Sequence, residues 1–168
     1  IYLPAFKAAV QDAGVWAIMG AYNKFRGQYT THHNTLTNSI LKGKWNFDGV
    51  VISDWSSAHS TEESAMYGLD LEMGTGTDGL GTTTANHYSH YYLADPFLKA
   101  IKSGELSEDL LDDKVRRILR LMYRTNMSSN RPLGRANNKE HHEVAKRVAT
   151  EGIVLLKNKE KPVVHLGI

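Results

Sequence analysis

The sequence has 168 residues, 41% of them apolar and 23% charged, which is the balance of a globular domain with a core of its own. Its 20 basic and 18 acidic side chains leave a net charge of +2, and no basic run gathers on one segment, so we expect no nucleic-acid partner. The absence of cysteine excludes disulfides and thiolate chemistry, and no apolar stretch reaches about 18 residues, so we expect no membrane partner.

Both ends of the sequence predict a fragment of a longer protein. The chain opens at Ile1 without an initiator Met, and no signal peptide follows. The last run, 162–168, has the composition of a strand with nothing after it to cover it. We therefore expect the remainder of the same protein, or another copy in a homo-oligomer, to complete the fold.

Two apolar runs in the first third of the chain, 15–19 and 50–52, predict strands. The second is β-branched throughout and apolar on both faces, which is typical of a parallel sheet covered by helices. A helix that starts near Pro4 and is ended by Gly14 precedes the first strand. A helix capped by Asn34 is expected between the two strands.

The same alternation continues further along the chain. Ser60 and Glu63 form a capping box for a short helix, and 69–73 is expected to be another strand. Two more helices are expected, one ending at Gly104 and a longer one capped by Ser107 with an apolar stripe along it. Strands separated by helices fit either a (β/α)₈ barrel or an open doubly wound sheet, and periodicity alone does not distinguish them.

One carboxylate stands where both of these architectures gather their chemistry, at the carboxyl end of a strand. Asp54 follows the strand 50–52 directly, and Trp55 beside it offers the flat apolar surface that sugar rings often need. A retaining glycosidase uses one ionised carboxylate as a nucleophile and a second carboxyl about 5 Å away as the acid. Asp54 can supply the first role, although spacing alone favours a cap for the turn that follows.

Several motifs, in order over nearly the whole chain, resemble glycoside hydrolase family 3. They are the run 48–55 (DGVVISDW), the run 68–73 (GLDLEM), the run 21–24 (AYNK) with Gly27 after it, the helix 112–119 and the run 145–158. That family combines a (β/α)₈ barrel with an α/β sandwich domain. The resemblance therefore implies an α/β fold in which residues 1–127 are the C-terminal part of a TIM-like barrel, 128–139 a linker and 140–168 the start of the sandwich domain.

The resemblance also implies roles for four residues. It makes Asp54 the catalytic nucleophile and Trp55 a wall of the sugar site. Tyr22 matches a tyrosine near the nucleophile, whose hydroxyl can donate a hydrogen bond that keeps the carboxylate ionised and oriented. Met73 would line the substrate pocket, and plain packing is an equal alternative for it. The general acid/base and the residues that grip the sugar hydroxyls are expected outside residues 1–168.

The sequence departs from the family pattern near this site. Gly20 replaces a common Ser, Arg26 stands where Asn is frequent, and Ser56-Ser57 replaces Gly-Ala. None of these changes touches the nucleophile, but they leave the linkage preference open.

The function expected from the resemblance is a retaining β-glycoside hydrolase, with β-glucosidase favoured and a β-linked oligosaccharide or glucoside as the substrate. A β-xylosidase or N-acetylglucosaminidase of the same family is an alternative, and so is a non-catalytic glycan-binding relative. No cofactor and no metal are expected. The sequence does not determine the cellular compartment, and a periplasmic or secreted location is favoured over the cytoplasm.

Other signals are weaker. The run 74–79 matches G-x-G-x-x-G, but poor helix formers follow it, so we expect a loop rather than a dinucleotide site. Tyrosines 88, 91 and 92 could contact a longer glycan or pack on the rim. Histidines 32, 33, 141 and 142 form two adjacent pairs, and 87 and 90 could share a face, but no metal-binding spacing occurs and ordinary surface histidines are expected.

Four other carboxylates compete with Asp54. Glu62 and Glu63 lie in the first turn of the short helix, and Glu63 is accounted for by its cap. Asp70 and Glu72 alternate with leucines along the strand expected over 69–73, and structural ion pairing is their favoured role.

Overall fold

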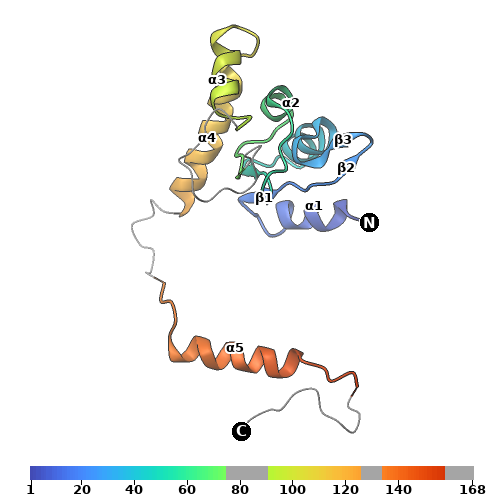
Figure 1. Cartoon of the computed structure of the whole chain (residues 1–168), viewed down its shortest axis with the longest axis vertical. Coiled ribbons are helices and arrows are strands. Elements are labelled where there is room, and N and C mark those ends of the chain that lie inside the picture. The colour runs from blue at the N-terminus through green and yellow to red at the C-terminus, as the bar shows by residue number, and fades with distance from the viewer. Residues whose placement is uncertain (75–90, 126–133, 158–168) are drawn as a thin grey trace. The chain divides into compact units, whose positions relative to one another are not determined.

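The computed structural model describes residues 1–74, 91–125 and 134–157 (Figure 1). The chain divides into two units, residues 1–129 and residues 130–168. In the second unit, α5 (Lys139–Gly152) begins after Asn138, whose Oδ1 accepts the backbone N–H of His141. The linker and sandwich-domain assignments over 128–168 stay predictions, and residues 128–133 and 158–168 lie outside the described part of the chain.

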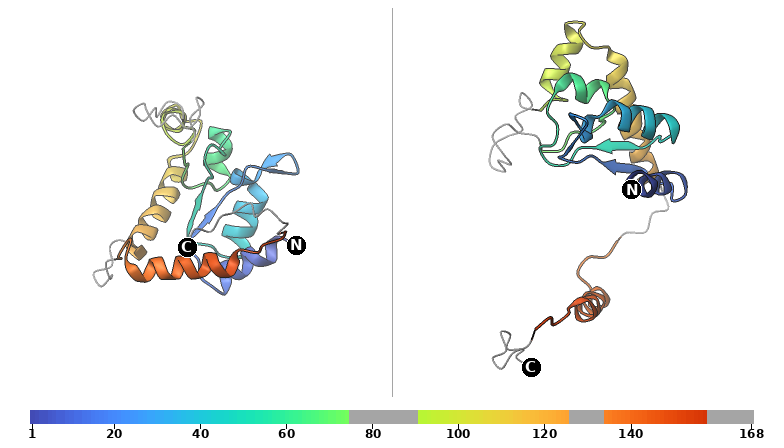
Figure 2. Two further views of the ribbon diagram at one scale, coloured as in Figure 1. Left: turned by 60° about the horizontal axis from the view of Figure 1, so that its bottom comes forward. Right: turned by 90° about the vertical axis from the view of Figure 1, so that its right-hand side faces the viewer.

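The centre of the first unit is a pair of parallel strands. β1 (Ala17–Met19) pairs with β4 (Val50–Ile52), with Ala17 opposite Val50 and Met19 opposite Ile52. Figure 2 shows the two strands side by side, with the helix η2 on one flank and α4 on the other. The alternation of strands and helices is confirmed for this part of the chain, because parallel neighbours require a crossover between them.

The strand expected over 69–73 is reduced to a single parallel bridge between Ile52 and Leu71. A side chain explains the shortening. The backbone N–H of Val51 donates to Asp70 Oδ2 (2.8 Å) rather than to a carbonyl of the neighbouring segment. The segment nevertheless runs beside β4, because the Ser53 N–H donates to the Leu71 carbonyl (2.9 Å).

Helical segments join the strands. α1 (Leu3–Gln11) has its proline in the first turn, as expected, and η2 (Asn34–Lys44) crosses from β1 to β4 as a π-helix. Its cap lies one residue earlier than predicted, since His33 Nδ1 accepts the Leu36 N–H (3.3 Å). α2 (Thr61–Met66) follows β4, and the predicted cap is present, with Ser60 Oγ accepting the Glu63 N–H (3.2 Å).

A short β-hairpin with a two-residue loop lies between β1 and η2 along the chain. β2 (Lys24–Phe25) pairs with β3 (Gln28–Tyr29), and a 3₁₀ turn, η1 (Thr30–His32), follows. Both hairpin loop residues have left-handed backbones, with φ of 51° at Arg26 and 85° at Gly27. This is the geometry of a type I′ turn, in which the second residue is typically glycine.

Two further helices complete the first unit. α3 (Asp95–Lys102) and α4 (Glu108–Thr125) close over the far side of the 69–73 segment. The apolar core contains Leu41, Phe47, Val51, Ala58 and Leu69. None of the helices in the described ranges is long and apolar enough to cross a bilayer.

A buried lysine on α4 ties these elements together. Lys114 Nζ donates to the carbonyls of Ala65 (2.8 Å) and Leu69 (2.6 Å), and burial lowers the pKa of this ammonium to about 8. The carbonyl of Ala65 belongs to the last turn of α2, so the ammonium supplies a donor to the C-terminal end of this helix.

Candidate active site

The candidate site lies where the parallel segments end together. Asp54 stands two residues beyond Ile52, whose neighbours are Met19 on β1 and Leu71 on the third segment. Its carboxylate is half-buried, and its Oδ1 accepts the backbone N–H of Trp55 (2.7 Å). The Trp55 side chain is 52% exposed, so this edge is open to a ligand.

The contact expected between Tyr22 and Asp54 is present. Tyr22 follows β1, and its phenol lies close enough to the Asp54 carboxylate for that carboxylate to raise the pKa of the phenol. Desolvation is the largest cause of this raised pKa, and the negative charge of the carboxylate acts in the same direction. The phenol therefore remains protonated, so it is available as a donor to the carboxylate. The catalytic role of the pair stays a prediction.

The indole of Trp55 lies directly against the backbone of Gly74. A Cβ at Gly74 would overlap the ring atoms Cε3 and Cζ3 of Trp55, and the glycine has a φ of +55°. Only glycine fits this close approach without strain. Gly74 is also the first glycine of the G-x-G-x-x-G run, and its close contact with Trp55 explains why glycine occurs at this position. Residues 75–79 of that run lie outside the described residues.

Serine hydroxyls and backbone groups join the turn after β4 to Met73. Ser53 Oγ accepts the Met73 N–H (2.8 Å), and the Ser56 N–H donates to the Met73 carbonyl (3.2 Å). Ser56 Oγ donates to the Gly74 carbonyl (2.9 Å). The structure thus brings the backbone of Met73 to the turn that carries Asp54. The half-buried Met73 side chain as part of the sugar pocket stays a prediction.

The expectation of surface histidines is wrong for one pair. His32 is fully buried and His33 is 5% exposed, because both rings bind backbone groups. His32 Nε2 accepts the His59 N–H (3.2 Å), and His33 Nε2 lies 3.1 Å from the Phe25 carbonyl. The sequence carries no clear signal for this burial, since the partners are set by contacts distant in the chain.

The second histidine pair lies on the surface, as expected. His141 and His142 on α5 are exposed, and residues 87 and 90 lie outside the described part. In the described residues no group of three or more histidine or acidic side chains could hold a metal ion.

The competing carboxylates have other partners. Asp70 is buried and its Oδ1 lies 2.6 Å from Lys42 Nζ, which confirms the expected structural ion pair. Glu63 takes part in the helix cap through its backbone N–H, and its side chain has a second neighbour, because Oε2 lies 2.9 Å from His32 Nδ1. Glu72 accepts the backbone N–H groups of Tyr92 (3.2 Å) and Leu93 (2.7 Å).

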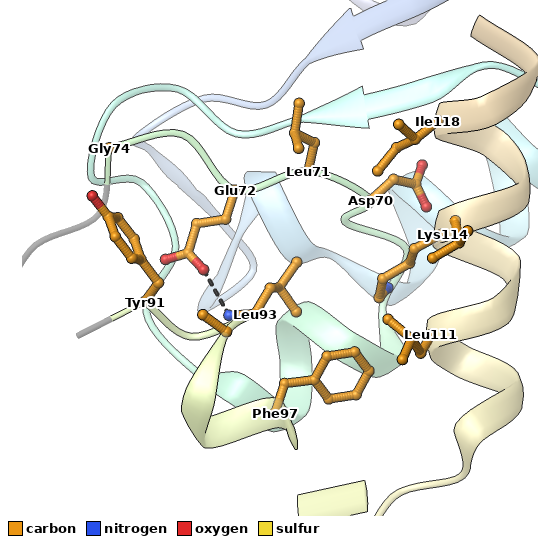
Figure 3. Close-up of a pocket in the computed structure, with 12 residues that line it drawn as sticks. Asp70, Leu71, Glu72, Gly74, Tyr91, Leu93, Phe97, Leu111, Lys114 and Ile118 are labelled. Atoms are coloured by element: carbon orange, nitrogen blue, oxygen red, sulfur yellow. Dashed lines mark hydrogen bonds between the residues drawn. The ribbon is translucent and has the colours of Figure 1, made fainter. Parts of the chain in front are cut away.

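A cavity of about 390 Å³ lies between the 70–74 segment, α3 and α4 (Figure 3). Apolar side chains such as Phe97 and Leu111 form much of its wall, and the Glu72 carboxylate points to the backbone of Leu93 beside it. Neither Asp54 nor Tyr22 lines it. Tyr91 lines this cavity and Tyr92 packs against the core, and contact of either tyrosine with a longer glycan stays a prediction. Residue 88 lies outside the described residues.

A comparison with known families agrees with this geometry. Residues 1–121 match the model described as glycosyl hydrolase family 3 N terminal domain. The chain belongs to glycosyl hydrolase family 3. It is 54% identical over 158 residues to a beta-glucosidase of Bacteroides ovatus, covering 94% of this chain and 21% of that protein. It is 34% identical over 160 residues to thermostable beta-glucosidase B of Acetivibrio thermocellus, covering 95% of this chain and 19% of that protein.

Solved structures give the same assignment. Beta-glucosidase 3B of Thermotoga neapolitana, in complex with glycerol, superposes with a TM-score of 0.71 at 33% identity, covering 95% of this chain and 22% of that chain. A beta-glucosidase of Bifidobacterium adolescentis superposes with a TM-score of 0.70 at 29% identity, with the same coverage of 95% and 22%. The chain therefore spans about a fifth of the length of these relatives.

The expected fold class is confirmed, with one correction. The chain is part of the N-terminal, TIM-barrel-like α/β domain of the family. The expectation that it forms the C-terminal end of that barrel is not what the family match supports, and it is replaced by this broader placement. The expected position came from the family resemblance alone. The hydrophobic pattern offered no check on it, because successive β-α units of a barrel share that pattern.

Proposed function

We propose that this chain is part of a retaining β-glycoside hydrolase, a β-glucosidase, in which Asp54 is the nucleophile. The observation that carries the proposal is the position of Asp54 at the shared carboxyl edge of the parallel segments, with the protonated phenol of Tyr22 beside its carboxylate. The relatives named above as beta-glucosidases support the substrate class, a β-linked oligosaccharide or glucoside.

In this reaction the ionised Asp54 attacks the anomeric carbon of the terminal non-reducing sugar. A glycosyl ester forms while the glycosidic C–O bond breaks, and a second carboxyl group protonates the departing oxygen. Water, deprotonated by the same second carboxyl group now acting as a base, then attacks the anomeric carbon. The bond between that carbon and Asp54 breaks, which regenerates the carboxylate and releases the sugar with its original configuration. The Tyr22 phenol orients the attacking oxygen, and the exposed face of Trp55 supports the sugar ring.

The second carboxyl group is expected from another part of the protein. Asp70 is engaged with Lys42, Glu63 with His32, and Glu72 with backbone amides. The proposal is therefore that residues 1–168 alone turn over no substrate, and that the remainder of the protein supplies the acid/base and the groups that bind the sugar hydroxyls.

The test uses the whole protein and three aryl β-glycosides: the glucoside, the xyloside and the N-acetylglucosaminide. We expect the glucoside to be hydrolysed fastest and the sugar to appear first as the β-anomer in proton NMR spectra. Initial release of the α-anomer would contradict a glycosyl-enzyme intermediate. Glycan binding without any hydrolysis would favour the non-catalytic relative instead.

A further inference from the structure

Two buried residues of η1 hold the second half of the turn that begins at Asp54. The Ser57 hydroxyl donates to Thr31 Oγ1 (3.0 Å), and the His59 backbone N–H donates to His32 Nε2 (3.2 Å). The Thr31 and His32 side chains are both fully buried. The path of the chain from Asp54 to α2 therefore depends on groups that solvent does not reach.

The tautomer of His32 follows from the hydrogen bond at Nε2. Nε2 accepts the His59 N–H and so keeps its lone pair, which leaves the proton of the neutral ring on Nδ1, and Nδ1 lies 2.9 Å from Glu63 Oε2. Glu63 is itself fixed in the first turn of α2, where the Ser60 hydroxyl accepts its N–H. A neutral His32 thus joins three elements, η1, the turn after β4 and α2.

We propose that His32, oriented by Glu63, is a positioning residue for the candidate nucleophile, and that the turn carrying Asp54 keeps its reactive geometry only while this imidazole is neutral. The proposal rests on the proposed function. Protonation would place a second N–H on His32, directed at the N–H of His59, and two donors cannot form the bond that now exists. The turn would then lose one of its two hydrogen bonds to η1.

The surroundings keep this ring neutral. Burial lowers the pKa of His32, and the charge on a protonated His59 acts in the same direction, while the Glu63 carboxylate opposes them. His59 stacks on Tyr29 with 3.7 Å between ring centroids, and Lys24 Nζ lies 4.4 Å from the same tyrosine ring. Burial and the Lys24 charge lower the pKa of His59 as well. His32 therefore takes up its second proton only below its ordinary pKa of 6.5.

The neighbouring histidine provides a matched control. His33 is also buried, but its Nδ1 accepts the Leu36 N–H and its Nε2 lies against the Phe25 carbonyl. These contacts belong to η2 and β2 rather than to the turn after Asp54. Two adjacent buried histidines thus differ in whether they touch the candidate nucleophile's turn.

The experiment compares His32→Leu, His32→Gln and His33→Leu in the whole protein, with hydrolysis of 4-nitrophenyl β-glucoside as the readout. We expect His32→Leu to lower kcat by about ten- to a hundredfold with a smaller change in KM, because small displacements of a reacting group cost rate. His32→Gln offers an oxygen to the His59 N–H but does not titrate. It should recover most of kcat and move the acid limb of kcat/KM to lower pH.

His33→Leu should leave both kcat and the acid limb unchanged. Equal losses of kcat in His33→Leu and His32→Leu, or a wild-type acid limb in His32→Gln, would overturn the proposal. If His32→Leu does not fold, the comparison uses His32→Gln and Glu63→Gln instead. Glu63→Gln removes the carboxylate charge beside Nδ1 and should move the acid limb to lower pH, and an unmoved limb in both variants overturns the proposal.

A wild-type protein without hydrolytic activity would defeat the proposed function, and a separate measurement then decides the positioning claim. Amide hydrogen exchange reports whether the His59 N–H is protected. Protection that is lost on acidification in the wild type and kept in His32→Gln supports the role of a neutral His32. Identical protection in the two proteins at every pH contradicts it.

Discussion

The two ends of β4 are held by different chemistry. At its start, guanidinium groups of α4 bind the turn that precedes the strand. Arg117 donates to two backbone carbonyls of this turn (3.0 and 3.1 Å), and Arg124 pairs with both oxygens of Asp48 (3.0 and 2.7 Å). At the carboxyl end the partners are serine hydroxyls, backbone amides and a neutral imidazole. The groups beside the Asp54 carboxylate are also uncharged, namely the Trp55 N–H, which donates to it, and the phenol of Tyr22.

This difference separates stability from reactivity. A cation bound tightly to a carboxylate stabilises its charge and makes it a weaker nucleophile, whereas a neutral donor orients it at a smaller cost in basicity. We therefore expect substitutions at the start of β4 to change mainly the free energy of unfolding. Substitutions at its carboxyl end should change mainly the rate of the chemical step.

The largest effect is expected for Tyr22→Phe. Removing the phenol hydroxyl beside Asp54 should lower kcat by about a hundredfold, comparable to the loss of one donor that stabilises charge in a reaction. The side chain is 55% exposed, so the denaturation midpoint should hardly move. Tyr123→Phe, on the exposed surface of α4, is the control, and an unchanged kcat in Tyr22→Phe would break the comparison.

Arg117→Met tests the start of the strand. Its guanidinium side chain is 14% exposed and donates to the carbonyls of Phe47 and Gly49, so its loss should lower the free energy of unfolding by about 2 kcal/mol. Arg116→Met, in which the side chain is 65% exposed, should change it by less than about 0.5 kcal/mol. Urea denaturation measures both changes in the free energy of unfolding. A large loss of kcat at a temperature where Arg117→Met is folded would contradict the view that the start of β4 affects stability and not the chemical step.

The smallest effect is expected at the tip of the hairpin between β1 and η2. Arg26 has a φ of 51°, a conformation that asparagine adopts more readily in a type I′ turn. Arg26→Asn should raise the free energy of unfolding by about 0.5 kcal/mol, because part of the gain is offset by losing the guanidinium above the Phe25 ring. Arg26→Lys keeps the backbone penalty and should give no gain.

The local signals in the sequence predict the elements around the site well. The β-branched run 50–52 is a buried strand, Ser60 caps α2, and Asp54 stands at a strand end. These features depend on a few consecutive residues, so the sequence contains the information. The assignment of Tyr22 to the neighbourhood of Asp54 came from the family resemblance, and the effect of the Asp54 carboxylate on the pKa of the phenol agrees with it.

Features that depend on distant partners could not be predicted. The buried state of His32 depends on Glu63 and His59, which are about thirty residues further along the chain. The shortened third strand depends on where the Asp70 carboxylate binds, and an alternating pattern of leucines and acids is equally compatible with a full strand. Propensity reports what a segment can form, and tertiary contacts decide what it does form.

The central claim is that Asp54 is the nucleophile, and covalent trapping tests it most directly. Incubation of the whole protein with an activated 2-fluoro β-glucoside, followed by peptide mass spectrometry, should locate one sugar on the peptide that contains Asp54. The Asp54→Asn variant should remain unlabelled. Turnover of β-glucosides with no label on Asp54, or with the label on another carboxylate, would contradict the account.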